Sequence, residues 1–192
     1  MIDLTATTDR TRAVAVGIAE DQLDAPTPTG STVGEMVQHL MGLCVAFRDA
    51  AAKVDGPTTS TPPGPVSEPL PDDWRTRVDG LLGELAAAWQ DAAAWDGATR
   101  AGGVDLPGEV AGLVALDEVL LHGWDLAVAT GQPYEPTDAE CEAVVPVVSP
   151  EPGDPDGSGR GDLFGPVIEV PDDAPAFDRV LGLAGRDPRW TP

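Results

Sequence analysis

The stretch LDEVLLHGWDLAVATG, residues 116–131, decides the fold because it combines an apolar helical surface with three cation-binding groups. Glu118 and His122 are four residues apart, and Asp125 follows three residues later, so the three share one side of a helix. The rest of that side carries mainly small apolar residues, whereas a stripe in contact with water would carry more charge. We therefore expect this side to face the interior of a helical protein.

The second of the two histidines, His39, lies in another apolar segment, VQHLMGL (residues 37–43). Its helical neighbours are apolar, so His39 is also expected to face the interior. A buried carboxylate needs a compensating partner, and a metal ion held by His39, Glu118 and His122 would supply it. Two histidines and a glutamate form the donor set of catalytic zinc sites, which keep one position open.

Other interpretations of these residues stay open at the level of spacing. Glu118 and His122 could form an exposed helical pair, and His39 could be an ordinary core histidine. The donors also suit nickel, iron, manganese or cobalt, so zinc is the first expectation and nickel an alternative. Asp125 is expected to orient a ligand or to contact a bound substrate, as a catalytic-site residue that is not itself a ligand.

Apolar periodicity and capping residues predict an all-α fold with four long helices in a bundle. Capping boxes are expected at Thr32 with Glu35 and at Thr137 with Glu140. No segment alternates clearly as a strand does, so no sheet is expected. The expected helices cover about residues 4–23, 32–54, 73–95 and 108–130, followed by shorter helices at 138–149 and 174–185, the last opened by Pro175 and stopped by Gly185.

The length of 192 residues fits one domain, with a core bundle at about 4–131 and a C-terminal appendage at about 132–192. The proline-rich residues 55–72 are expected to form a long surface crossover without regular helix. Leu163 and Phe164 are expected to fold back onto the body of the protein.

The charge is strongly negative, with 33 acidic residues against 11 basic ones and a formal net charge of −22. Such a surface repels nucleic acids and anionic membranes. The chain has no apolar run of membrane-spanning length and no signal peptide pattern, so a cytoplasmic protein is expected. Cys44 and Cys141 predict neither a disulfide framework nor a thiolate cluster, and Cys44 is expected to be a buried small hydrophobe.

Two segments resemble a known family. STVGEMVQHLMGLCVAF (residues 31–47) is similar to the first metal segment of the DinB-like metal-binding bundles. LDEVLLHGWDLAVATGQP (residues 116–133) resembles the second metal segment of their actinobacterial branch, which includes mycothiol-dependent maleylpyruvate isomerase. The ending APAFDRVLGLAGRDPRW (residues 174–190) is similar to short members of that branch. Ser31 stands where the family often has tryptophan, which we interpret as a change in packing or at the edge of the pocket and not as a loss of the metal.

The resemblance implies a four-helix bundle with a long crossover and a divalent metal held by His39, Glu118 and His122. It also implies mycothiol, or a similar low-molecular-weight thiol, as co-substrate. The isomerase has a further C-terminal domain for which this chain has no room, so isomerisation of maleylpyruvate itself is not the expected reaction.

Three functions follow as hypotheses. The first is a metal-dependent thiol transferase or isomerase that acts on a small electrophile. The second is a metal-binding bundle without catalysis, used as a sensor, resistance or interaction protein. The third is a hydrolase that activates a metal-bound water. A small-molecule substrate is the expected partner, and whether two copies form a homodimer stays open.

Overall fold

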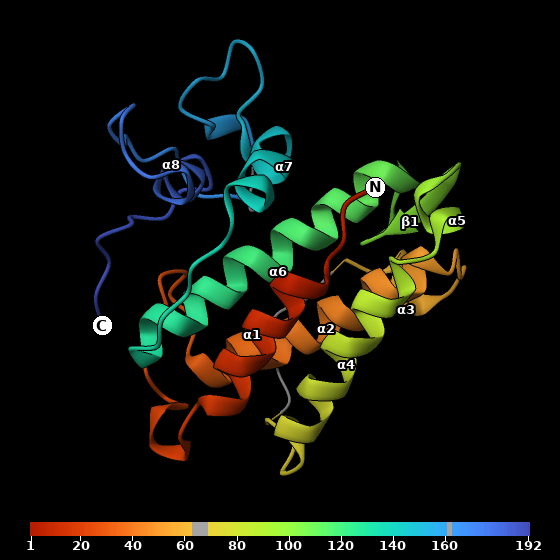
Figure 1. Ribbon diagram of the computed structural model, residues 1–192, viewed down its shortest axis with the longest axis horizontal. Helices are drawn as coiled ribbons and strands as arrows, with labels where there is room; N and C mark the ends of the chain where they lie inside the picture. The colour runs from red at the N-terminus through yellow and green to blue at the C-terminus, as the bar shows by residue number, and fades with distance from the viewer. Residues whose placement is uncertain (63–68, 161–162) are drawn as a thin grey trace.

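The computed structural model describes residues 1–62, 69–160 and 163–192, and its core is a bundle of four long helices (Figure 1). The four are α1 (Thr5–Gly17), α2 (Val33–Ala51), α4 (Trp74–Ala88) and α6 (Gly108–Thr130). Helices α4 and α6 each pack against both α1 and α2, so they lie across the bundle from one another. The expected all-α four-helix architecture is confirmed.

Helix α6 is the central element of the molecule. Every residue from Ala115 to Ala127 is buried except Glu118. A helix that is apolar on all sides needs cover on all sides, and α7 (Asp138–Val148) packs on α6 in addition to α1 and α2. Gly131 ends α6 in the left-handed region at φ 69°, as expected for a glycine cap.

Helix α2 begins as the sequence predicts. The Thr32 side chain accepts a hydrogen bond from the backbone N–H of Glu35, and the Glu35 carboxylate accepts from the backbone N–H of Thr32 at 2.8 Å. This reciprocal pair satisfies two N–H groups that the first turn would otherwise leave free. The helix ends at Ala51, three residues before the predicted end, because the chain turns at Lys53 with φ 55°.

The first and third long helices are also shorter than predicted. The first ends at Gly17, because Ile18 is extended, and a 3-10 turn η1 (Glu20–Gln22) follows. The third is interrupted after α4, and a new short helix α5 (Ala92–Trp95) starts where the Asp91 side chain accepts from the N–H of Ala93. The proline-rich crossover also contains a short helix α3 (Pro57–Ser60), so the prediction that it holds no helix is wrong there; residues 63–68 lie outside the described residues.

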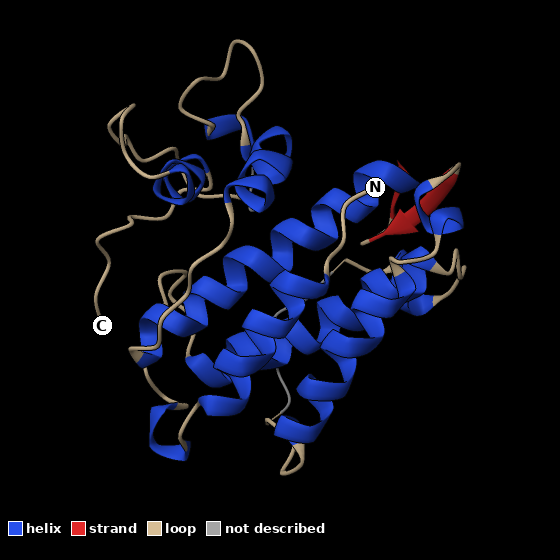
Figure 2. Ribbon diagram, viewed as in Figure 1, coloured by secondary structure: helices blue, strands red, loops and turns tan. Residues whose placement is uncertain are grey.

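The prediction of no sheet is wrong, because a small hairpin lies between α5 and α6 (Figure 2). Strands β1 (Ala98–Ala101) and β2 (Val104–Pro107) pair antiparallel, with Ala101 opposite Val104. The two glycines between them have φ 58° and 82°. A two-residue turn with both φ values positive matches the twist of a hairpin, and Gly-Gly is a sequence signal for it.

The C-terminal segment contains α7, a 3-10 turn η2 (Ser158–Arg160) and α8 (Ala176–Leu183). Helices α7 and α8 lie side by side on one flank of α6 (Figure 1). Pro175 precedes α8 as its N-cap, and Gly185 follows it with φ 76°. Phe164 packs against the core, but Leu163 is 83% exposed, so only one of the two residues folds back as predicted.

Both cysteines lie buried in the core, where their thiols resist ionisation. Cys44 and Cys141 are buried free thiols, and burial raises the pKa of Cys44 to about 12 and that of Cys141 to about 11. Among the described residues, no helix is both long and apolar enough to cross a bilayer.

Glu140 joins the C-terminal segment to the bundle. Its carboxylate completes the predicted capping box with Thr137, and it also accepts two hydrogen bonds from Arg10 of α1, at 3.0 and 3.1 Å. The Thr7 hydroxyl of α1 donates to the same group. Burial disfavours the charged carboxylate, but the bonds from Arg10, Thr7 and Thr137 outweigh burial and lower the pKa of Glu140 to about 2.

We expect Glu140→Gln to lower the free energy of unfolding at pH 7 by about 2 kcal/mol, because hydrogen bonds to a charged group are lost. The folded pKa of about 2 lies below the unfolded value of ~4.3. The stabilisation is therefore complete above pH ~5 and disappears as the pH falls towards 2. Urea unfolding of both proteins between pH 7 and pH 3 measures it. Glu142→Gln, an exposed change on the same helix, is the control and should have little effect; equal losses in both variants would contradict the assignment.

Candidate metal centre

His39 from α2 meets Glu118 and His122 from α6 where the two helices pack together. One ligand atom from each of the three lies within 4.8 Å of the others. His122 Nε2 is 3.1 Å from Glu118 Oε2. The imidazole rings of His39 and His122 stand edge to face, with centroids 5.0 Å apart. The structure thus brings together the three side chains that the sequence selected.

The centre lies at the edge of the bundle and keeps access to solvent. The His122 side chain is 11% exposed, whereas that of Glu118 is 28% exposed and His39 is half-buried. Glu118 is therefore less buried than its apolar surroundings predicted. The centre is thus partly exposed to solvent through Glu118 and His39.

Asp125 fixes the orientation of His122. It is fully buried, and its Oδ2 lies 3.0 Å from His122 Nδ1. When Nδ1 carries the proton and donates to this carboxylate, the Nε2 lone pair points to Glu118 and is free to bind a cation. A carboxylate behind a histidine is the usual support of a metal-binding imidazole. The predicted role of Asp125 as an orienting residue agrees with this position.

Arg186 completes the arrangement, and the sequence did not single it out. It lies in the segment that follows α8, and its Nε and Nη2 donate to the two Asp125 oxygens at 3.0 and 2.8 Å. Its remaining Nη1 donates to the carbonyl of Ala184 at 3.2 Å. Two parallel bonds between a guanidinium and a carboxylate fix direction as well as charge. The C-terminal segment therefore supplies the countercharge for the residue that holds His122.

A close contact holds α6 in place beside the centre. A Cβ at Gly123 would lie 2.3 Å from Thr11 Oγ1 and 2.4 Å from the Tyr134 hydroxyl. The Thr11 hydroxyl donates to the carbonyl of Val119 at 3.1 Å, so α1 and α6 approach closely at this point. A glycine directly after His122 allows this close approach.

The pKa shifts follow from these contacts. Burial disfavours protonated His122, but the hydrogen bonds to Asp125 and Glu118 raise its pKa to about 9. Burial also disfavours charged Glu118, yet its bond with His122 keeps its pKa below the usual value. Burial and then the charge on His122 lower the pKa of His39. Protonated His122 thus pairs with the charged Glu118 carboxylate across their 3.1 Å contact.

The donor set fits a divalent ion. Neutral imidazole nitrogens and a carboxylate oxygen are ordinary ligands of zinc and nickel. The three side chains converge from two helices, with one ligand atom of each within 4.8 Å of the others, and would hold such an ion together. Asp125 and Arg186 lie behind His122 and would remain the support of the site.

Asp117 is a second residue that the sequence did not single out. It precedes Glu118, is 3% exposed, and its Oδ1 has no hydrogen-bond partner among the described residues. Burial first, and then the nearby Glu118, raises its pKa well above the usual value. Burial thus disfavours the charged form of Asp117.

We expect Arg186→Met to lower the free energy of unfolding by about 3 kcal/mol or more, because Asp125 would remain buried without its partner. Arg186→Lys should fall between this variant and the wild type, because an ammonium group cannot form both bonds at once. The matched control is Arg189→Met. Arg189 lies three residues away and its side chain is 86% exposed, so the loss should stay below about 0.5 kcal/mol. Denaturant unfolding measures all four proteins, and similar losses for Arg186→Met and Arg189→Met would contradict the role of Arg186.

Comparisons with known proteins give a family and several relatives. A family model described as the mycothiol maleylpyruvate isomerase N-terminal domain matches residues 4–127. Two uncharacterised proteins of Mycobacterium tuberculosis strains are each 29% identical over 194 residues, which cover 94% of this chain and 94% of theirs.

Two solved structures share the fold. The crystal structure of a mycothiol-dependent maleylpyruvate isomerase superposes with a TM-score of 0.52 at 17% identity, over 76% of this chain and 64% of that one. A mutant of the same enzyme gives 0.51 at 16% identity, with the same coverage. The matched part is thus less than two thirds of the isomerase chain. Because the family model covers most of the four-helix bundle, this chain belongs to the mycothiol maleylpyruvate isomerase N-terminal domain family.

Proposed function

We propose that this protein is a metal-dependent enzyme that uses mycothiol, or a similar small thiol, to transfer the thiol to a small electrophile or to isomerise one. The observation that carries the proposal is the convergence of His39, Glu118 and His122, with Asp125 and Arg186 fixing His122 from behind. Family membership and the fold shared with a mycothiol-dependent enzyme support the choice of thiol. Zinc is the proposed ion and nickel the alternative.

A divalent ion at this centre would lower the pKa of a thiol bound to it and so supply a thiolate nucleophile at neutral pH. The side chains of the centre would supply its orientation, its negative charge and its access. Asp125 keeps the proton on Nδ1 of His122 and so keeps Nε2 available as a donor. Glu118 supplies one negative charge, and the exposed edge formed by Glu118 and His39 gives the thiol and the electrophile a path to the centre.

The thiol reaction has two forms. In a transferase, the thiolate adds to the electrophilic carbon and remains attached. In an isomerase, it adds to a cis double bond, the resulting single bond rotates, and the thiolate leaves again. Both begin with the same nucleophile, so one site could perform either reaction.

We also propose that the bundle and the C-terminal segment act as a single unit. Arg186 lies beyond the residues that the family model matches, yet it donates both bonds to Asp125. A bundle without this segment would leave Asp125 buried and unpaired, which is costly.

A hydrolase is the second candidate, because the solvent access of Glu118 would also admit a water molecule to the centre. The two candidates differ in their requirement for thiol. Conversion of an ester or amide without thiol would support the hydrolase, whereas consumption of thiol would support the transferase or isomerase.

We expect purified protein to contain about one divalent ion per chain, and His39→Ala and His122→Ala to lose most of it, because each removes one of three ligands. Asp125→Asn should weaken metal binding by ~10- to 100-fold, as is usual when the support of a ligating histidine is changed. Metal analysis after dialysis, with competition by a chelator, gives both results. Glu109→Gln, on the first turn of α6, is the control. Metal retained by His122→Ala would overturn the site.

We expect the zinc-loaded protein to accelerate conjugation of mycothiol with an electrophile, and His122→Ala to lose the acceleration. Mass spectrometry of the conjugate and titration of free thiol measure the rate. Loss of neither thiol nor electrophile across a varied panel, with the metal bound, would favour a binding protein without catalysis.

A further inference from the structure

We propose that the electrophile carries no negative charge, because no side chain of the centre offers a carboxylate-bearing molecule a free cation with which to pair. This inference rests on the proposed function and narrows it to a class of substrate. It depends on where the positive charges of the chain are used and on the charges that surround His39, Glu118 and His122.

Every lysine and arginine lies within the residues that the structure describes, and each already has a partner. Eight of the eleven form ion pairs with carboxylates. The other three, Lys53, Arg160 and Arg179, donate to backbone carbonyls. Enzymes that bind carboxylate or phosphate substrates usually present a free guanidinium to them, and here the guanidinium groups are engaged.

Arg186 is the arginine that the structure places at the centre, and it is held by two bonds to Asp125. It could bind a substrate carboxylate only by leaving Asp125 buried and unpaired, which would cost several kcal/mol. A divalent ion held by His39, Glu118 and His122 would have its remaining position filled by sulfur, in the thiolate as in a thioether product. An incoming carboxylate would thus lose its hydration without gaining a partner.

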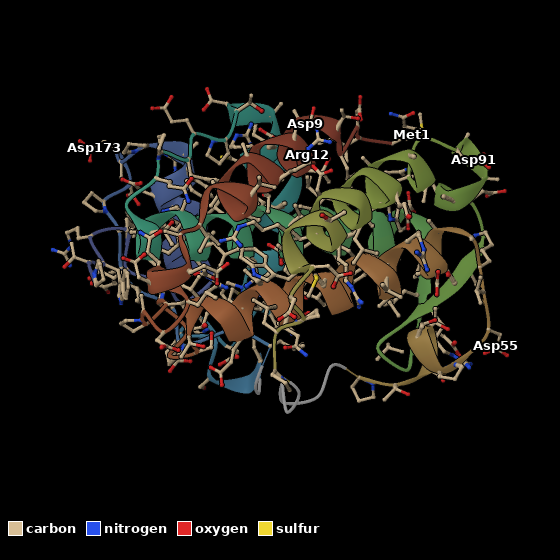
Figure 3. All side chains as sticks on the ribbon, turned by 90° about the horizontal axis from the view of Figure 1, so that it is seen from below. Met1, Asp9, Arg12, Asp55, Asp91 and Asp173 are labelled. Carbon is tan, nitrogen blue, oxygen red and sulfur yellow. The ribbon has the colours of Figure 1, made fainter. Side chains whose placement is uncertain are left out.

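Carboxylates further from the centre also disfavour an anionic electrophile. Glu35 is exposed and lies one helical turn before His39 on α2. Figure 3 shows carboxylates at the edge of the molecule, among them Asp9, Asp55, Asp91 and Asp173. With a formal net charge of −22, the field around the protein repels anions as they approach. Salt weakens this repulsion, because the screening length is only ~10 Å at 0.1 M.

Three thioethers of mycothiol test the inference by binding alone. They are made from N-(2-hydroxyethyl)acrylamide, N-acryloylglycine and N-(2-aminoethyl)acrylamide, which end in a neutral, an anionic and a cationic group. In each, sulfur bonds to the β-carbon of the acrylamide, the double bond is lost, and the thiol proton moves to the α-carbon. Calorimetric titration of the zinc-loaded protein gives the dissociation constants at low and high salt.

The anionic thioether should bind at least ~10-fold more weakly than the neutral one at low salt, equivalent to ~1.4 kcal/mol. The difference should narrow at high salt. The cationic thioether should bind as well as the neutral one or better. Equal or tighter binding of the anionic thioether would overturn the inference while leaving the proposed use of thiol intact. Binding of none of the three would overturn the proposed function, and the inference with it.

Gly42 allows the effect of local charge to be measured directly. It lies three residues after His39 on α2, so its side chain would be a neighbour of His39 on the helix surface. A Cβ built there meets nothing within 4 Å, and the position is exposed. Gly42→Arg therefore places a cation beside the centre without displacing packed atoms, and Gly42→Gln adds length without charge.

Gly83 provides the control for net charge. It is exposed on α4, across the bundle from α6, and a Cβ there also meets nothing within 4 Å. Gly42→Arg should tighten binding of the anionic thioether by several-fold, whereas Gly42→Gln and Gly83→Arg should leave it nearly unchanged. An equal gain from Gly83→Arg would show that net charge alone sets the preference, and the assignment to the centre would be wrong.

Discussion

The structure of the site depends on the buried carboxylate of Asp125. An ionised group without contact with water is tolerated only when its charge and its lone pairs are satisfied. His122 donates to it from one side and Arg186 from the other, at 3.0 Å and at 3.0 and 2.8 Å. Because the two donors come from α6 and from the segment after α8, one carboxylate links the orientation of a candidate metal ligand to the folding of the C-terminal segment.

The candidate site could be predicted from the sequence as far as its contacts are local. Glu118, His122 and Asp125 share a helix, and the spacing of four and three residues fixes their relative directions. His39 could be added because its own helix has an apolar stripe, and two such stripes in a bundle face each other. Arg186 could not be found in this way. It is 61 residues from Asp125, lies outside any helix, and its segment carries no periodicity that would point it inward.

The fold could be predicted where apolar periodicity is long, as in α2 and α6, and failed where tertiary packing ends an element. The break after α4 is an example. Trp95 donates its indole N–H to the Trp89 carbonyl at 2.8 Å, and the rings of the two residues stand edge to face. A Cβ at Gly112 of α6 would lie 2.6 Å from the Trp95 ring, so this tryptophan needs a glycine opposite it. The sequence shows the two tryptophans and the glycine, but not that they meet.

The strong negative charge and the candidate metal centre have a common consequence. A chain with three times as many carboxylates as basic groups uses its arginines to hold elements together, as Arg10 does with Glu140 and Arg186 with Asp125. Few positive charges then remain for recognition, and a bound divalent ion would become the strongest positive charge at the centre. A molecule that approaches along the exposed edge of Glu118 would be attracted mainly by that ion, and a thiol has the donor that such an ion prefers. The distribution of charge thus favours a sulfur nucleophile bound to the ion and an uncharged partner for it.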